Sequence, residues 1–576
     1  MTRLGRNTAA AIVLIILLSP FSFAGKGFQR EQNPRSVETG RYWVFLEPET
    51  YSPAELQRAL DETANSLTPR SLARRSKVIF TDPPIRICDL PISQERLASI
   101  EESGCEIVRH MRYLNAVVVK GSQVELDRVR GLSFVKNVTS VLAWSVTGYN
   151  SESKEVSSQA EKPSLPIEWN DEEYGYSLRQ SQLVNLPPVH NLGYHGNGVL
   201  IGVQDTGFDN LIHHCYAHLD VVAAWDFLNN DDDVSDQGDR GSGSHGCRTL
   251  SVIAALDTGR FIGAAPEAQF ILTKTEDSEG EYELEEDLWV AGLWFHDSLG
   301  VDVLSSSLSY RNWYDWEQMD GQTAITTRAA DSAAAAGIVI VNSVGNTGNR
   351  IYPDTKIGAP ADSRFVISVG GVRSNDEYWS SASQGPTYDG RIKPDVSAQA
   401  YNTYTCSNYT DSTYRTSSGT SFSTPMVAGI AALVLEANPE LTPAQVMSIL
   451  HETASQADDP DTLIGYGVVD ALAAVILAEQ MAGVSSSILL PSETGFTAYP
   501  NPFNGILKLA FEDGFTPDVL SLYNLSGRRI LRLERSGAFY IPQAYNLDLS
   551  NLSSGTYYIR ARQGERNIFK AVILLK

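Results

Sequence analysis

The sequence predicts a three-layer α/β domain with a parallel sheet, placed between a smaller α+β module and a C-terminal β-sandwich. Two patterns carry this prediction. Over residues 174–482, short runs of β-branched and apolar residues alternate with helical patterns, which is typical of a sheet covered by helices on both faces. Over residues 483–576, short alternating strands are separated by Gly-containing turns, as in a β-sandwich.

The composition is that of a folded and acidic protein. Hydrophobic residues make up 42% of the 576 residues and charged residues 20%, values that exclude wholesale disorder. The formal net charge is -24, and residues 174–485 alone carry 40 acidic and 14 basic side chains. A nucleic-acid binder normally has a basic footprint, so the sequence predicts no nucleic-acid partner.

The N-terminus predicts export. Arg3 and Arg6 precede an apolar run over residues 9–18, and small residues flank Phe23 up to Ala24. This is the layout of a secretory signal peptide over residues 1–24, and the run is shorter than the roughly 20 residues that span a bilayer. An uncleaved anchor is the alternative. Either way, we expect a protein that is secreted or held at the cell surface.

Residues 25–147 predict a small α+β module. A strand is expected over residues 41–47, and Ser52, Pro53 and Glu55 supply an N-cap, a first-turn proline and a capping-box glutamate for the helix that follows. Further strands are expected over 116–120 and 135–141, with a helix over 122–130 between them. Residues 148–173 lack apolar periodicity and predict an exposed linker. A propeptide and an ordinary N-terminal domain would both have this pattern.

Buried strands are expected at five places in the central domain, over residues 199–204, 270–273, 301–304, 338–341 and 365–369. Helices are expected over 284–299 and 329–336. In parallel sheets of this kind, functional side chains lie beyond the carboxyl ends of the strands. The C-terminal strands are expected over residues 507–511, 519–523, 529–533, 545–549, 556–562 and 568–575.

Three short segments of the central domain contain an acid, a base and a nucleophile. Asp205 ends a buried strand before a tight turn, His245 precedes an apolar helix, and Ser421 opens another apolar helix. A serine hydroxyl needs a neighbouring base, imidazole has a pKa suited to that task, and a buried carboxylate fixes the imidazole tautomer. The free N–H groups at the start of a helix also favour negative charge next to Ser421.

These segments, Val203–Gly207, Gly243–Gly246 and Ser418–Met426, resemble the active-site motifs of the subtilisin-like serine proteases, in the order acid, base, serine. Gly263–Ala268 and the stretch around Trp289–Ser309 resemble the same family, so the likeness covers residues 174–480. The resemblance implies a secreted serine endopeptidase that hydrolyses polypeptides through Asp205, His245 and Ser421 and an acyl-enzyme intermediate. The resemblance implies that this reaction requires no cofactor.

The resemblance also implies auxiliary residues and partners. Asn346, in the segment Val344–Gly348, would donate to the oxyanion together with the backbone N–H of Ser421. Ser307, Leu308 and Ser309 would pair with the substrate backbone as an added strand. The N-terminal module resembles the inhibitory propeptides of these enzymes, with processing expected within residues 145–173. The C-terminal module resembles sorting domains of the bacterial type IX secretion route, so the machinery of that route is an expected partner.

The sequence departs from the family pattern directly after the candidate base. Cys247 and Arg248 stand where a threonine and often a second histidine are usual, and neither position supplies the base. The chain has five cysteines, too few for a disulfide scaffold. A disulfide between Cys88 and Cys105 in the N-terminal module is one open alternative.

Several polar clusters have both a functional and a plain interpretation. Asp226, Asp231 and Asp233 lie in an acidic loop before His245 that suits calcium, although the spacing is not that of an EF-hand. His213, His214 and His218 suggest a solvated loop rather than a metal site, because no ligand set completes them. The acidic run over residues 276–287 is expected to be a solvated face, or else to favour basic residues in substrates.

Two rival functions remain beside the protease. An α/β-hydrolase would need Gly-x-Ser-x-Gly with the acid and histidine after the serine, whereas Ser423 replaces the last glycine and only His451 follows. The other rival is a catalytically inactive subtilase-like surface or adhesion protein whose C-terminal domain is the functional part.

Overall fold

The computed structural model describes residues 37–144, 155–156, 171–237, 243–277, 281–482, 496–499, 505–511, 515–524, 529–534, 544–552, 555–564 and 566–574. The expected signal peptide over residues 1–24 lies outside the described residues. So does most of the expected linker over residues 148–173.

The N-terminal module has the predicted α+β composition. Ser52 caps the first helix, and its side chain and that of Glu55 form the expected capping box. The strands pair antiparallel in the order β4, β1, β3, β2. In chain order its elements are β1 (Val37–Leu46), α1 (Pro53–Asn65), α2 (Pro69–Arg75), η1 (Ile87–Asp89), α3 (Gln94–Glu102), β2 (Glu106–Met111), η2 (Arg112–Leu114), β3 (Ala116–Lys120), α4 (Gln123–Arg130) and β4 (Val135–Trp144).

The central domain is built on a seven-stranded sheet in the order β15, β14, β13, β12, β6, β10, β7. Every neighbouring pair in this sheet is parallel. The sheet explains why the sequence has continuous apolar runs, because each central strand is buried on both faces. Its strands are β6 (Leu200–Asp205), β7 (Asp220–Asp226), β10 (Gln269–Lys274), β12 (Val303–Ser306), β13 (Val339–Ser343), β14 (Val366–Val372) and β15 (Val396–Gln399).

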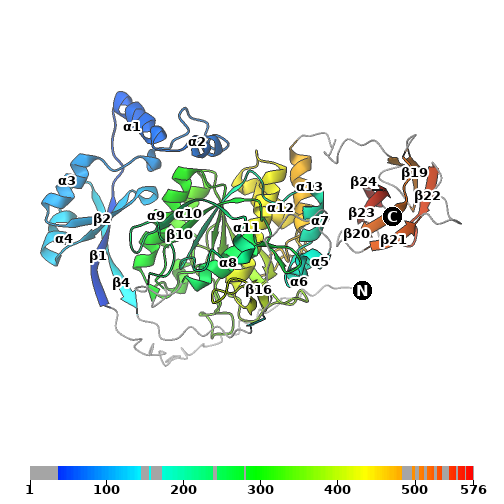
Figure 1. The fold of residues 1–576 in the computed structure, drawn as a ribbon. Coiled ribbons are helices and arrows are strands. Elements are labelled where there is room, and N and C mark those ends of the chain that lie inside the picture. Colours follow the sequence, from blue (N-terminus) through cyan, green and yellow to red (C-terminus); the bar gives the residue numbers. More distant parts are fainter. Residues whose placement is uncertain are drawn as a thin grey trace, which may run out of the picture. The chain divides into compact units, whose positions relative to one another are not determined.

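Helices cover both faces of this sheet and make the three predicted layers (Figure 1). One face packs its Ile201, Val341 and Val369 against α8 (Ser244–Ala254) and α11 (Thr420–Ala437). The other face packs Ile271 and Ile340 against α9 (Leu284–Leu299) and α10 (Ile325–Ala334). Among the described helices, α11 alone is long and apolar enough to cross a membrane, and 89% of it is buried as the core helix of this domain.

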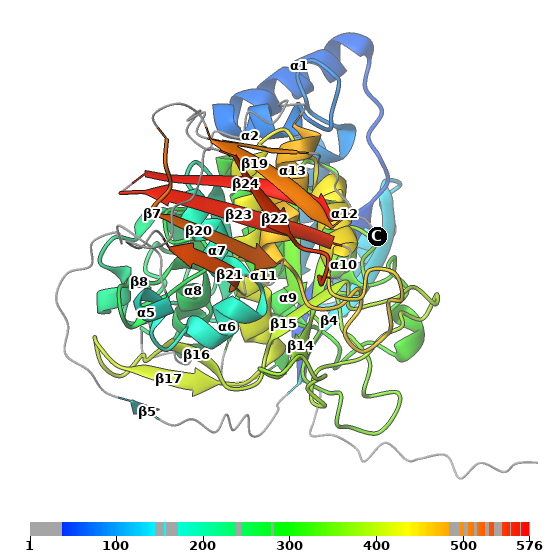
Figure 2. The same ribbon diagram turned by 90° about the vertical axis from the view of Figure 1, so that its right-hand side faces the viewer.

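Smaller elements complete the central domain. The hairpin of β16 (Thr403–Cys406) and β17 (Tyr414–Ser417) leads into α11, and β5 (Glu155–Val156) pairs antiparallel with β17 (Figure 2). The remaining elements are α5 (Asp171–Tyr174), α6 (Leu178–Leu183), α7 (Leu186–Leu192), η3 (His214–Tyr216), β8 (Leu256–Asp257), β9 (Phe261–Ile262), β11 (Glu281–Tyr282), η4 (Trp316–Gln318), α12 (Pro443–Thr453) and α13 (Ala471–Met481).

The C-terminal module consists of two antiparallel sheets around one apolar core, as expected for a β-sandwich. Leu507, Leu522 and Ile559 are among its buried residues. One sheet has the order β18, β19, β22 and the other β21, β20, β23, β24. The strands are β18 (Phe496–Tyr499), β19 (Ile506–Phe511), β20 (Val519–Asn524), β21 (Arg529–Glu534), β22 (Ala544–Asp548), β23 (Gly555–Gln563) and β24 (Arg566–Leu574).

Candidate active site

Asp205 is the last residue of β6, near the middle of the parallel sheet, and its side chain is almost fully buried. Oδ1 accepts a hydrogen bond from the backbone N–H of Thr206 at 2.8 Å, and Oδ2 accepts one from the hydroxyl of Thr249 at 3.0 Å. These contacts fix the carboxylate plane. One oxygen is therefore aimed at the first turn of α8.

His245 lies in that first turn. Its Nδ1 is 2.6 Å from Asp205 Oδ1. Because an ionised carboxylate only accepts hydrogen bonds, this contact assigns the ring proton to Nδ1 and leaves the lone pair on Nε2. The imidazole keeps 24% of its surface exposed, so part of the ring faces solvent. The structure thus brings the predicted acid and base together.

Ser421 lies at the start of α11, next to Phe422, whose ring centroid is 5.7 Å from that of His245. The Ser421 hydroxyl donates to the carbonyl oxygen of Ser307 at 3.4 Å. Between the two described side chains of Ser421 and His245 there is no hydrogen bond. The serine is therefore next to the acid–base pair, with its hydroxyl directed at Ser307. Catalytic hydrogen bonds are often unformed in the absence of substrate.

Asn346 lies in the loop after β13 and contacts the N-terminus of α11. Its Oδ1 accepts from the backbone N–H of Thr420 at 2.8 Å and from the Thr420 hydroxyl at 3.2 Å. A Cβ added to Gly419 would be 3.6 Å from Asn346 Nδ2. The side-chain amide therefore lies against the backbone that presents Ser421, as an oxyanion donor requires.

The predicted substrate edge directly follows β12. Ser307 Oγ donates to the carbonyl oxygen of Ser421 at 2.9 Å, so the edge and the nucleophile segment are tied together. The Leu308 carbonyl accepts from Asn342 Nδ2 at 2.9 Å. Ser309 follows, with its Oγ 3.0 Å from the position that a Cβ on Gly345 would take. Residues 307–309 thus lie beside Ser421.

The acidic loop does not form a convergent cation site in the described part of the chain. The carboxylate of buried Asp226 pairs with Lys274 Nζ at 3.1 Å and accepts the N–H of Leu228 at 2.7 Å. Asp231 accepts from Gln237, and Asp233 accepts from the Ser235 hydroxyl at 2.6 Å. Among the residues with described positions, no group of three or more His, Cys, Asp or Glu side chains could hold a metal ion. Calcium binding here stays a prediction.

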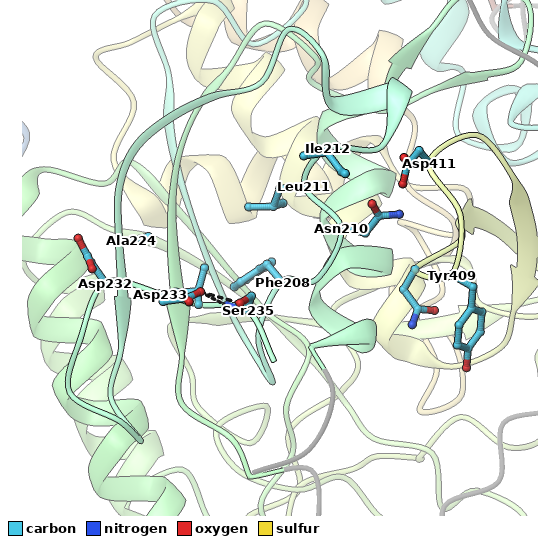
Figure 3. Close-up of a pocket in the computed structure, with 12 residues that line it drawn as sticks. Phe208, Asn210, Leu211, Ile212, Ala224, Asp232, Asp233, Ser235, Tyr409 and Asp411 are labelled. Atoms are coloured by element: carbon cyan, nitrogen blue, oxygen red, sulfur yellow. Dashed lines mark hydrogen bonds between the residues drawn. The ribbon is translucent and has the colours of Figure 1, made fainter. Parts of the chain in front are cut away.

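A cavity of about 620 Å³ opens beside this loop (Figure 3). Neither Asp205 nor His245 is among its lining residues. Its apolar part is built from the segment after Asp205, and Asp232, Asp233 and Asp411 add carboxylates. The lining residues are Phe208, Asn210, Leu211, Ile212, Ala224, Asp232, Asp233, Val234, Ser235, Asn408, Tyr409 and Asp411.

Parts of two polar clusters expected to be solvated are buried instead, whereas His214 and His218 are half-buried. His213 is fully buried, and its Nε2 bonds the carbonyl oxygen of Thr413 at 3.0 Å. In the acidic run, Glu286 is fully buried and accepts from Trp313 Nε1 at 2.9 Å and from the Tyr314 hydroxyl at 2.8 Å. Burial raises the pKa of Glu286 to about 8, although these hydrogen bonds oppose the rise. The prediction of a solvated face is therefore wrong for this part of the run.

The N-terminal module contacts the central domain through α9, the helix that contains Glu286 and Asp287. Trp43 Nε1 donates to Asp287 Oδ1 at 2.5 Å, and Arg74 and Arg75 both pair with Asp297. All of these side chains are buried. In addition, β11 of the central domain pairs antiparallel with β4 and thereby adds a fifth strand to the edge of the module's sheet.

Sequence reasoning missed Thr249 and the pairing of β5 with β17. Thr249 follows His245 by four residues, so one face of α8 presents both side chains toward Asp205. That spacing is the signal that could have found it. The β5 contact leaves no such signal, because a two-residue strand has no period to detect.

Comparison with known proteins gives three matches in chain order. Residues 41–160 match the Peptidase S8 propeptide domain of Bacteroidota, residues 196–467 the Subtilase family, and residues 497–575 the Secretion system C-terminal sorting domain.

Two curated relatives agree with the subtilase match, and one solved structure is given for comparison. Serine protease AprX of Bacillus subtilis (strain 168) is 33% identical over 308 residues, which are 48% of this chain and 66% of AprX. Subtilisin DY of Bacillus licheniformis is 33% identical over 293 residues, which are 51% of this chain and 96% of subtilisin DY. A solved protease of Pseudoalteromonas arctica PAMC 21717 is 25% identical with a TM-score of 0.42, covering 54% of this chain and 100% of that one.

Proposed function

Because the chain belongs to the subtilase family, we propose that it cleaves polypeptides with Ser421 as nucleophile, His245 as general base and Asp205 as the carboxylate that orients the base. The chain is a serine-type endopeptidase that is secreted or held at the cell surface, since a propeptide and a secretion sorting domain flank its subtilase domain. The observation that carries the residue assignment is the 2.6 Å hydrogen bond between Asp205 and His245.

In the proposed reaction, the Ser421 hydroxyl turns from the Ser307 carbonyl to His245 Nε2. The imidazole removes its proton as the oxygen attacks the scissile carbonyl, and Asp205 stabilises the imidazolium that forms. The same proton then passes to the leaving amine, which gives an acyl-enzyme on Ser421. A water molecule, activated by His245, hydrolyses that ester.

The oxyanion of the tetrahedral intermediate would be bound by Asn346 Nδ2 and the Ser421 N–H. The anchor of Asn346 Oδ1 on the Thr420 N–H supports this role, because it fixes the amide before substrate arrives. Donors that are positioned in advance need no reorganisation as charge develops.

The substrate would bind as an extended strand beside residues 307–309. Support for strand addition to the central domain comes from β4 of the N-terminal module, which pairs antiparallel with β11 (Glu281–Tyr282), a segment distinct from residues 307–309. Strand addition relies on main-chain hydrogen bonds and tolerates many sequences. The same contact supports inhibition of the enzyme by its own N-terminal module until the linker is cut.

The alternative, an inactive surface or adhesion protein, is not favoured, because the acid–base pair is assembled with a 2.6 Å contact. A fluorophosphonate probe tests the proposal. Processed wild-type protein should be labelled at Ser421, and labelling should be lost in Ser421→Ala and His245→Ala. Ser418→Ala is the matched control, because that hydroxyl accepts from the Asn402 N–H and should not affect labelling.

Two results would overturn this function. One is the absence of labelling in wild-type protein from which the propeptide has been removed. The other is labelling that persists in Ser421→Ala, which would place the nucleophile elsewhere.

The sorting domain would be recognised by the type IX secretion machinery. Deleting residues 483–576 should then leave the enzyme inside the producing cell, while the full chain reaches the medium or the cell surface.

A further inference from the structure

Three cysteines meet in one buried cluster behind the proposed base. Cys215 lies in η3, Cys247 in α8 and Cys406 at the end of β16, and each side chain is fully buried. Cys247 follows His245 by two residues. The other two cysteines of the chain, Cys88 and Cys105, belong to the N-terminal module.

Within this cluster, Cys247 and Cys406 are in direct contact. Their Sγ atoms are 3.4 Å apart although the residues are 159 positions apart in sequence. Tyr216 holds both residues, since its hydroxyl donates to the Cys247 carbonyl and lies 3.5 Å from Cys406 Sγ. A disulfide has an S–S length of about 2.05 Å, so the two sulfur atoms must approach by only about 1.4 Å to form one.

The three thiols are not equivalent chemically. Burial raises the pKa of Cys406, but hydrogen bonds from Cys215 and Cys247, with the nearby His213, outweigh it and bring this pKa well below its usual value. The hydrogen bond to Cys406 and burial raise the pKa of Cys247. Thiol–disulfide exchange begins with a thiolate, so Cys406 is the group suited to attack first.

We propose that Cys247 and Cys406 form a disulfide in the exported protein. The oxidant would be a protein disulfide of the oxidising compartment through which the chain passes. The Cys406 thiolate attacks that disulfide and forms a mixed disulfide, and Cys247 then attacks the Cys406 sulfur. The donor leaves as a dithiol, having accepted two electrons, and two protons pass from the cysteines to the donor sulfurs. The exchange takes place late in folding, when the three cysteines are already in contact and the cluster is still open to the donor.

The disulfide would join the two elements that present the proposed base and nucleophile. Helix α8 carries His245, and the β16–β17 hairpin leads through residues 418–419 to Ser421. We expect the bond to raise the resistance of the enzyme to heat, because it closes a long loop of the unfolded chain. Cys215 would stay a buried thiol.

Differential alkylation of the full chain tests the pairing directly. The Ser421→Ala protein avoids self-digestion; it is folded with oxidised glutathione, unfolded in guanidinium, alkylated, reduced and alkylated again with a heavier reagent. We expect the heavy label on Cys247 and Cys406, and the light label on Cys88, Cys105 and Cys215. Light label on Cys247 and Cys406, or a disulfide that contains Cys215, would overturn the proposal.

Thermal unfolding gives a second readout that does not depend on how well each variant packs. In the Ser421→Ala protein, dithiothreitol should lower the unfolding midpoint by several degrees, on the order of 5 °C. The same shift should occur in Cys215→Ala and vanish in Cys406→Ala. An equal shift in Cys406→Ala would contradict the assignment. Because both tests use protein without the proposed nucleophile, their outcome is independent of whether the catalytic proposal holds.

Discussion

The carboxylate of Asp205 and the imidazole of His245 are joined by a hydrogen bond of 2.6 Å, although the two residues belong to different elements, β6 and α8. Thr249 of the same helix donates to the other carboxylate oxygen at 3.0 Å. Helix α8 therefore holds the carboxylate at two points, which fixes its orientation toward the ring.

Replacing Asp205 by Asn should lower kcat about 10⁴-fold, because an amide N–H facing Nδ1 favours the wrong imidazole tautomer. The measurement is hydrolysis of a chromogenic peptide by enzyme processed in trans. Asp220→Asn is a matched control, since that carboxylate is exposed and bonds only Gln269 Nε2 in the described structure. A loss of less than tenfold in Asp205→Asn would contradict the assigned role.

The side chain of Asn346 has two roles, oxyanion donor and anchor of the Thr420 N–H, and two variants are needed to distinguish them. Asn346→Ala removes both the proposed oxyanion donor and the acceptor that anchors the Thr420 N–H at 2.8 Å. Asn346→Asp keeps an acceptor oxygen, removes the donor and adds a negative charge next to the oxyanion. We expect kcat to fall about 10²–10³-fold in both variants, with little change in KM. Near-normal kcat in Asn346→Asp would mean that the side chain only anchors the backbone.

Sequence alone was sufficient for the elements whose signals are local. The strand that ends at Asp205 is a continuous apolar run, and the capping box at Ser52 and Glu55 forms as predicted. The edge strand β7 was missed although residues 221–225 form a short apolar run, and as an edge strand it is only partly buried. The hairpin strands β16 and β17 were missed because they are short and rich in Thr and Ser.

The buried carboxylates could not be predicted, because their partners come from distant parts of the chain. A run of acidic residues normally indicates a solvated face. Here Asp287 meets Trp43 of the N-terminal module, and Glu286 meets Trp313 and Tyr314 of the loop after β12. The local sequence of residues 276–287 contains no pattern from which these partners could be predicted.

Arg74 should be a main determinant of binding between the N-terminal module and the central domain. Its guanidinium pairs with Asp297 and donates to the carbonyl oxygens of Val301 at 2.7 Å and Ala336 at 3.2 Å, and the arginine side chain is 2% exposed. Breaking a buried ion pair costs about 3–5 kcal/mol, so Arg74→Ala should raise the inhibition constant of the module at least 10²-fold.

The assay adds the module in trans to the processed enzyme. Arg130→Ala serves as control, because Arg130 forms an exposed pair with Asp127 inside the module and should leave inhibition unchanged. Equal inhibition by the Arg74→Ala and wild-type modules would show that the buried pair contributes nothing to the complex.

Binding of the module should also weaken as pH rises, through Asp287. Burial raises the pKa of Asp287 to about 7, against the hydrogen bond from Trp43 and the charge of Arg109. Its Oδ2 has no hydrogen-bond partner among the described residues, as suits a protonated carboxyl. Release of the module should expose the group and return its pKa to about 4, so that binding takes up a proton between these two values.

A group whose pKa is higher in the complex stabilises it fully below the free pKa, and that contribution is lost as pH rises to the bound pKa. Between about pH 4 and pH 7 the affinity should therefore fall by up to tenfold per pH unit, with no further loss from this group above pH 7. Titration calorimetry of the module with the Ser421→Ala central domain at pH 5, 6, 7 and 8 measures this slope. Asp287→Asn has no titrating proton and should flatten it, so a slope that is unchanged in this variant would assign the pH dependence to another group.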